Sequence, residues 1–223
     1  VALVAGGEYW DAMAPSTFAR SSPLLEEFSR EIAIERGAAD PLTTLKELTR
    51  AVFDRFEYKP RSTRVDSPID DALLERRGVC QDFTHITTAL VRRLGIPCRY
   101  VSGYLFHQKD SADRSSDGAT HAWVEALLPD LGWVGFDPTN NLLAGERHIR
   151  VAIGRDYSDV PPTRGVYKGG TAVRTELAVA VKVGPVQMAI AGEALPFVPW
   201  MSREAGAPMA ESLTRQQQQQ QQQ

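Results

Sequence analysis

The spacing of apolar residues changes at Gly95-Ile96-Pro97, and this change constrains the fold more than any other feature of the chain. Before this point apolar residues recur at helical spacing, and after it they alternate as in strands. A capping residue followed by proline occurs at Ser22-Pro23, Asp40-Pro41 and Ser67-Pro68. These pairs predict helices over about residues 23–36, 41–56 and 68–76, the last with Asp70 completing a capping box. A fourth helix is predicted to begin at Cys80.

The second half of the chain predicts strands. Residues 99–106, 120–128, 133–137, 149–153 and 171–183 are rich in strand-forming residues or alternate between polar and apolar ones. The polar stretch 107–119 and residues 155–170, with Pro161-Pro162 and Gly169-Gly170, predict loops. Helices followed by antiparallel strands predict an α+β fold, in which the helices lie on one side of the sheet.

Composition excludes several classes of protein. The net charge of −3 gives no basic surface for nucleic acid. No apolar run reaches the roughly 18–20 residues that a membrane span needs, and the first residues lack the pattern of a signal peptide, so the sequence predicts a cytoplasmic location. The chain has two cysteines, Cys80 and Cys98, which are too few for a disulfide scaffold or a four-ligand zinc site. We therefore expect no metal or cofactor.

Cys80 is the candidate nucleophile. The helix begins at or next to this residue, where free backbone N–H groups and the helix dipole favour negative charge. A thiol in this position ionises more readily, and the thiolate is the reactive form. Cys98 is expected to be a free, buried thiol, although a disulfide with Cys80 or a redox pair remains an alternative.

The hairpin 120–137 supplies a candidate base and an orienting acid. If its turn is centred on Pro129, His121 lies opposite Asp137, with Cβ atoms about 4.5–5.5 Å apart. The aspartate would then orient the imidazole as in Cys–His and Ser–His–Asp sites. His85 points roughly 140° away from Cys80 on the same helix, which excludes it as the base. We expect His107 and His148 to be surface residues.

Spacing alone leaves other roles open for these residues. His121 could be a strand histidine without a catalytic function, and Asp137, which precedes Pro138, could initiate a turn. Trp123 could belong to the core or contact substrate.

The resemblance to a known family is more specific. The motifs Gly78-Val79-Cys80-Gln81-Asp82-Phe83, Thr120-His121-Ala122-Trp123-Val124-Glu125 and Gly135-Phe136-Asp137-Pro138-Thr139-Asn140 resemble those of the bacterial transglutaminase-like family, a branch of the papain-like superfamily. The resemblance covers about residues 8–183. It implies a papain-like or transglutaminase-like core whose catalytic triad is Cys80, His121 and Asp137.

The resemblance also suggests further site residues and a domain organisation. The Cys80 backbone N–H and Tyr58 are candidate oxyanion donors, and Gln81 and Trp123 are candidate oxyanion or substrate contacts. The catalytic domain would span residues 21–183. Residues 1–20 would be a segment left from a preceding β-rich domain, and the Pro/Gly-rich and polyglutamine tail 184–223 is expected not to pack. Calcium is not implied.

The predicted activity is acyl transfer through a thioester. We expect a peptide or protein amide as substrate and favour hydrolysis, because the polar loop 107–119 suggests an open cleft. Transfer to an amine, as in a transglutaminase, is the alternative. A binding module that keeps the fold without catalysis is an alternative from another class.

Overall fold

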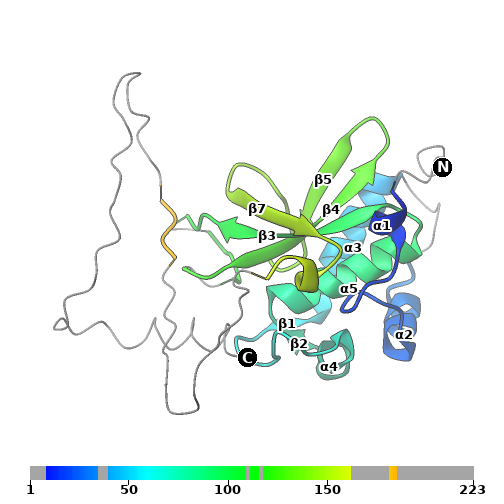
Figure 1. Ribbon diagram of the computed structural model, residues 1–223. Coiled ribbons are helices and arrows are strands. Elements are labelled where there is room, and N and C mark those ends of the chain that lie inside the picture. The colour runs from blue at the N-terminus through cyan, green and yellow to red at the C-terminus, as the bar shows by residue number, and fades with distance from the viewer. Residues whose placement is uncertain (1–8, 35–39, 109–110, 116–117, 162–180, 185–223) are drawn as a thin grey trace, which may run out of the picture.

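The computed structural model describes residues 9–34, 40–108, 111–115, 118–161 and 181–184 (Figure 1). The helices are α1 (Trp10–Met13), α2 (Pro23–Ile32), α3 (Pro41–Arg55), α4 (Ile69–Glu75), α5 (Cys80–Arg93) and the short 3₁₀ helix η2 (Tyr157–Asp159). The strands are β1 (Glu57–Tyr58), β2 (Arg77–Gly78), β3 (Cys98–Leu105), β4 (His121–Leu128), β5 (Gly132–Asp137), β6 (Leu142–Leu143) and β7 (His148–Gly154). Most of the strand predicted over residues 171–183, and the tail beyond residue 184, lie outside the described residues.

An antiparallel sheet with the strand order β6-β5-β4-β3-β7 forms one layer, and α5 packs on its central strands (Figure 1). The apolar side of α5 provides the core on one face of the sheet. Fully buried residues of α5 and the sheet join there in one cluster, which includes Phe83, Ile86, Val124, Ala126 and Phe136. The predicted α+β class is therefore confirmed.

The caps of α2 and α3 are those that the sequence predicts. The Ser22 hydroxyl accepts the N–H of Leu25 at 3.2 Å, and the Asp40 carboxylate accepts that of Thr43 at 3.0 Å. Helix α2 ends at Ile32, before the expected residue 36, because Ala33 adopts a left-handed conformation with φ of 51°.

The capping box predicted for α4 is wrong. Pro68 occupies the N-cap position without a side-chain cap, and the Ser67 hydroxyl accepts the Arg64 N–H at 3.1 Å. Asp70 instead accepts a hydrogen bond from the Ser22 hydroxyl at the start of α2. The bond between Asp70 and Ser22 has thus replaced the predicted bond between Asp70 and the start of its own helix, and it connects the starts of α2 and α4.

The segment before α2 is anchored to the rest of the domain by buried polar groups. The Arg92 guanidinium, at the end of α5, donates to the Ala12 carbonyl at 3.2 Å and to the Arg155 carbonyl at 2.7 Å. Asp156 has no exposed surface and accepts the Phe18 N–H at 2.8 Å. Residues 9–20 therefore pack against α5 and the end of β7, while the domain boundaries at residues 20 and 183 stay a prediction.

None of the helices in the described part of the chain combines the length and the apolar character that crossing a membrane requires.

Candidate active site

Cys80 is the first residue of α5, and it is partly exposed. The turn before it is held by Asp82, whose carboxylate accepts the Val79 N–H at 2.8 Å and the Thr63 hydroxyl at 2.5 Å. A side chain at position 78 would crowd this carboxylate, because a Cβ there would lie 2.8 Å from Asp82 Oδ2. The Gly-Val-Cys-Gln-Asp stretch thus forms a capped helix start that presents the thiol.

The carboxyl group of Asp82 is buried beneath this helix start. Burial raises the pKa of Asp82 to about 6, although the hydrogen bonds from Thr63 and Val79 act in the opposite direction. Cys98 is the free, buried thiol that the sequence predicts, and burial raises its pKa to about 12. Both cysteines are free, so the alternative of a Cys80–Cys98 disulfide does not hold.

The hairpin register differs from the predicted one. Glu125 pairs with Gly135 and Leu127 with Trp133, so the turn is centred on Asp130 and not on Pro129. His121 and Asp137 are therefore not directly opposite, but are displaced diagonally by two residues. Because side chains on a strand alternate with a period of two, the displacement leaves both on the same face of the sheet.

The His121 imidazole contacts Asp137 in spite of this shift. Its Nε2 lies 2.8 Å from Asp137 Oδ2, and both side chains are at most 2% exposed. The other ring nitrogen, Nδ1, is buried and has no hydrogen-bond partner among the described residues. Burial by itself would lower the pKa of His121, but the Asp137 carboxylate and the nearby Cys80 side chain raise it to about 10. This arrangement favours an imidazolium beside the Cys80 thiol.

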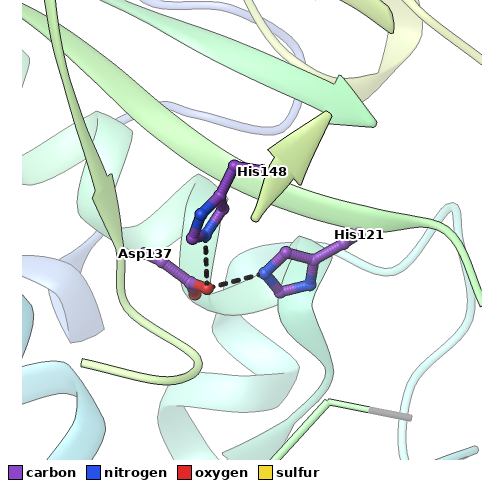
Figure 2. Close-up of side chains that lie close together, drawn as sticks. All are labelled: His121, Asp137 and His148. Atoms are coloured by element: carbon purple, nitrogen blue, oxygen red, sulfur yellow. Dashed lines mark hydrogen bonds and ion pairs between the residues drawn. The ribbon is translucent and has the colours of Figure 1, made fainter. Parts of the chain in front are cut away.

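The Asp137 carboxylate accepts hydrogen bonds from several donors at once. Oδ2 accepts from His121 and from His148 Nε2 at 3.2 Å (Figure 2), and also from the Asn140 side chain at 2.8 Å. Oδ1 accepts the backbone N–H groups of Thr139 at 2.9 Å and Asn140 at 3.2 Å. Burial would raise the pKa of Asp137, but His121, His148 and Asn140 together hold it well below its usual range.

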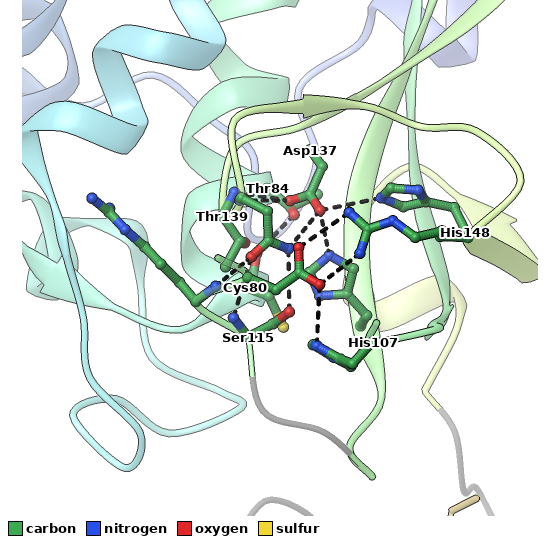
Figure 3. Close-up of polar contacts among 12 residues, drawn as sticks. Cys80, Thr84, His107, Ser115, Asp137, Thr139 and His148 are labelled. Carbon is green, nitrogen blue, oxygen red and sulfur yellow. Dashed lines mark hydrogen bonds and ion pairs between the residues drawn. The ribbon is translucent and has the colours of Figure 1, made fainter. Parts of the chain in front are cut away.

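Asn140 connects Asp137 with the loop that precedes β4. Its side-chain oxygen accepts the N–H groups of Arg114 at 2.7 Å and Ser115 at 3.2 Å, while its amide donates to Asp137 and to the Ser115 hydroxyl. Ser115 and Asp137 lie in one network of polar contacts together with Cys80 and His148 (Figure 3). No sequence pattern singled out Asn140 beyond its place in the motif after Asp137. The polar loop 107–119 is less open than its sequence suggests, since Ser115 is buried and the Asp113 side chain is 5% exposed.

The structure also places the three other histidines, two of which, His107 and His148, were expected at the surface. The His148 side chain is 3% exposed and contacts Asp137, so the expected surface position is wrong. His107 is 14% exposed and lies 3.4 Å from the Asp113 carboxylate, so it too is largely covered. His85 is fully buried, accepts the Tyr157 N–H at 3.2 Å, and does not serve as the partner of Asp137.

The remaining candidate site residues have the following positions. Gln81 is buried, and its amide donates to the Val65 carbonyl at 2.8 Å. Trp123 is 1% exposed and its ring lies against the rings of His121 and His148. Tyr58 pairs with Gly78 in the short β1–β2 ladder, two residues before Cys80. The oxyanion and substrate roles of these residues stay predictions.

The ligand atoms of His121, Asp137 and His148 lie within 4.8 Å of one another, a set that could hold a metal ion. In the structure, however, both imidazoles contact the same carboxylate oxygen directly, at hydrogen-bond distances of 2.8 and 3.2 Å. The observed geometry is thus that of a hydrogen-bonded network.

Comparison with known proteins agrees with this fold. Residues 28–138 match the model of the transglutaminase-like superfamily. The chain therefore carries a transglutaminase-like domain, and it belongs to a superfamily whose members are typically cysteine-dependent enzymes. The match includes Cys80, His121 and Asp137.

Relatives are similar over parts of their length. An uncharacterized protein of Mycobacterium leprae is 41% identical over 145 residues, which cover 65% of this chain and 50% of that protein. A protein-glutamine gamma-glutamyltransferase of Pseudomonas aeruginosa is 32% identical over 111 residues, but these cover 15% of its length. A candidate cysteine protease from Cytophaga hutchinsonii superposes with a TM-score of 0.58 at 28% identity, over 72% of this chain and 51% of that one. The chain thus spans about half the length of the Mycobacterium leprae protein and about half that of the Cytophaga hutchinsonii protein.

Proposed function

We propose that the protein is a thiol-dependent hydrolase of peptide or amide bonds, with Cys80, His121 and Asp137 as its catalytic triad. The observation that carries the proposal is the bond between His121 Nε2 and Asp137 Oδ2, which leaves Nδ1 as the nitrogen available to the Cys80 thiol. The raised pKa of His121 supports an ion pair between imidazolium and thiolate.

The reaction would proceed in two steps. The Cys80 sulfur attacks the amide carbonyl carbon, and the oxyanion that develops is stabilised by the backbone N–H of Cys80. This N–H is available because the first intrahelical donor of α5 is Phe83, which bonds to the Val79 carbonyl at 3.2 Å. His121 Nδ1 then protonates the leaving amine, which leaves a thioester on Cys80.

Water resolves the thioester in the second step. His121 Nδ1 takes a proton from the water molecule as its oxygen attacks the thioester carbonyl, and the carboxylic acid product leaves as the C–S bond breaks. Asp137 keeps the imidazole in one tautomer and orientation throughout. Tyr58 remains our candidate for a second oxyanion donor.

The second candidate function is transfer of the acyl group to an amine. The Pseudomonas relative named as a protein-glutamine gamma-glutamyltransferase favours it, whereas the structural relative described as a candidate cysteine protease favours hydrolysis. The buried side chains of Asp113 and Ser115 remove the open loop as an argument for hydrolysis. Our preference therefore rests on the structural relative, which matches a larger share of the chain.

The decisive experiment combines a glutamine-containing peptide library with a fluorescent primary amine. We expect wild-type protein to release new peptide termini or ammonia, with little amine incorporated, and the Cys80→Ala variant to be inactive. Mass spectrometry of the products measures both outcomes in one reaction.

Stable amine incorporation as the main product would establish the transferase instead. If wild-type protein and Cys80→Ala bind the peptides equally and neither changes them, the binding-module alternative holds. Cys98→Ala is the matched control, because Cys98 is fully buried and lies outside the proposed triad.

A further inference from the structure

We propose that His148 is a positioning residue of this site, a neutral donor that holds the Asp137 carboxylate in the orientation required by His121. The inference deepens the proposed function, since it adds a fourth side chain to the same network. It goes beyond the triad that the motifs define, because His148 lies outside all of them.

The hydrogen bonds of the His148 ring assign its tautomer. Nδ1 accepts the backbone N–H of Gly145 at 3.3 Å, so this nitrogen carries a lone pair and no proton. Nε2 must therefore carry the ring proton, and it lies 3.2 Å from Asp137 Oδ2. His148 is thus a neutral imidazole that donates to the carboxylate without competing with His121 for the negative charge.

Both imidazoles donate to the same carboxylate oxygen (Figure 2). The other oxygen, Oδ1, is held by the backbone N–H groups of Thr139 and Asn140. Rotation of the carboxylate would break bonds at both oxygens, so His148 helps to hold Oδ2 toward His121 Nε2. A fixed acceptor keeps the His121 proton on Nε2 and leaves Nδ1 available to Cys80.

The His148 ring is itself held by packing. Its side chain is 3% exposed, and its plane stands at 74° to the Trp123 ring with centroids 5.1 Å apart. The same indole lies at 29° to the His121 ring, with centroids 6.1 Å apart. Trp123 therefore packs beside both imidazoles.

An irregularity in strand pairing brings His148 to this face. The β3–β7 ladder pairs Ser102 with Ala152 but Gly103 with Arg150, so Val151 is an extra residue in β7. A regular ladder would pair Gly103 with Val151 and turn His148 to the opposite face of the sheet. Gly103 pairs with His121 of β4 on one side and, because of the bulge, with Arg150 of β7 on the other, so His121 and Arg150 lie on the same face. His148 is two residues from Arg150 on β7 and therefore lies on this face as well.

Glycine is required at the bulge. A Cβ at position 103 would lie 2.1 Å from the Ile149 carbonyl oxygen and 2.8 Å from the Trp123 ring. The close approach of β7 to β3, which brings His148 to Asp137, therefore depends on the absence of a side chain at this position.

The test compares two variants of the full chain. His148→Phe keeps a ring against Trp123 but has no donor, whereas His148→Gln retains a side-chain N–H that can reach Asp137. The first readout is the rate at which iodoacetamide alkylates Cys80 at neutral pH, located by mass spectrometry. We expect His148→Phe to slow alkylation about 10- to 100-fold, the effect of losing one hydrogen bond to a charged group. His148→Gln should stay within about threefold of wild type on the same basis.

The second readout is the ¹⁵N spectrum of the histidine rings, which reports the tautomer without any substrate. We expect the Nε2–H form for His148 in wild-type protein, and a changed His121 signal in His148→Phe but not in His148→Gln. Thermal unfolding of all three proteins verifies that the variants fold.

Three outcomes would overturn the proposal: an Nδ1–H tautomer for His148, equal alkylation rates in wild type and a folded His148→Phe, or tight Zn²⁺ binding that both variants lose. The last would identify the cluster as a metal site. Neither readout requires turnover, so the role of His148 is tested even if the protein hydrolyses no peptide. Conversely, hydrolysis that needs Cys80 but is unaffected in His148→Phe would leave the proposed function standing without this residue.

Discussion

Asp137 has no exposed surface, and five hydrogen-bond donors surround its carboxylate. An isolated buried carboxylate would become protonated, because burial disfavours the charged form. Here the surrounding donors outweigh burial and hold the pKa of Asp137 well below its usual range. The carboxylate therefore stays charged beside His121, and this charge is the main reason for the raised pKa of the imidazole.

The Asp137→Asn variant tests the importance of that charge. We expect it to fold but to lose at least about 100-fold in hydrolysis at neutral pH, because a neutral amide neither stabilises the imidazolium nor selects the correct tautomer. Initial rates with the best peptide substrate measure the effect. Asp54→Asn is the matched control, since Asp54 pairs with Arg50 on an exposed helix surface. Equal losses in both variants would contradict the role given to Asp137.

At the scale of elements, the start of α5 depends on a contact between two residues of one motif. Gly78 leaves room for the Asp82 carboxylate, which caps the helix by accepting the Val79 N–H. The position of Cys80 is set by this turn, so the glycine affects the proposed nucleophile without touching it.

The Gly78→Ala variant is expected to displace Asp82 and to destabilise the protein by about 1–3 kcal/mol, the usual cost of overpacking a tight site. Urea unfolding measures this loss. Gly145→Ala is the control, because nothing lies within 4 Å of a Cβ built at position 145. An unchanged unfolding midpoint in Gly78→Ala would show that the turn can relax around the added methyl group.

At the scale of the whole molecule, His85 joins parts of the chain that are distant in sequence. Its ring is stacked on Phe18, with centroids 5.3 Å apart, and is tilted against Tyr100 at 5.0 Å. Its Nε2 accepts the Tyr157 N–H, so this nitrogen carries no proton in the folded state. Burial lowers the pKa of His85 to about 3, even though Asp156 acts in the opposite direction.

The pH dependence of stability follows from this burial. In the unfolded chain His85 takes up a proton near pH 6.5, whereas the folded protein resists protonation down to about pH 3. The unfolded state binds more protons between these values, so stability falls as the pH decreases below about 6.5. This difference contributes a loss of about 2 kcal/mol at pH 5.

The His85→Gln variant should show a smaller loss of stability on acidification, because its amide can still accept the Tyr157 N–H but does not titrate. Urea unfolding of both proteins at pH 7.5 and pH 5 measures the difference, and the values at pH 7.5 correct for lost packing. Asp82 acts in the opposite direction, since its raised pKa favours folding as the pH falls toward 4. This contribution is common to both proteins. Parallel pH profiles would contradict the assignment to His85.

Local patterns in the sequence determined the class of fold and the residues of the proposed triad. Helical spacing before Pro97 and alternation after it reflect which side of each element is apolar, and this information is contained in short stretches of chain. The pairing of His121 with Asp137 was predicted on the wrong register, yet the contact is present. The predicted pairing partner was wrong by two residues, which is one full period of a strand, so each side chain still lies on the same face.

Only the tertiary structure decided which side chains complete the site. The burial of His148 depends on a bulge between β3 and β7. Asn140 contacts Asp137 nearby in the chain and also Ser115, which lies 25 residues earlier, in the loop before β4. Asp70 likewise contacts Ser22 in another helix in place of its local cap. Bulges and long-range contacts arise from packing between elements, so no periodicity within a single segment specifies them. The sequence by itself thus determined a helix-borne thiol and a strand-borne histidine and aspartate, and the packing of β7 and the loops determined the surroundings that hold them.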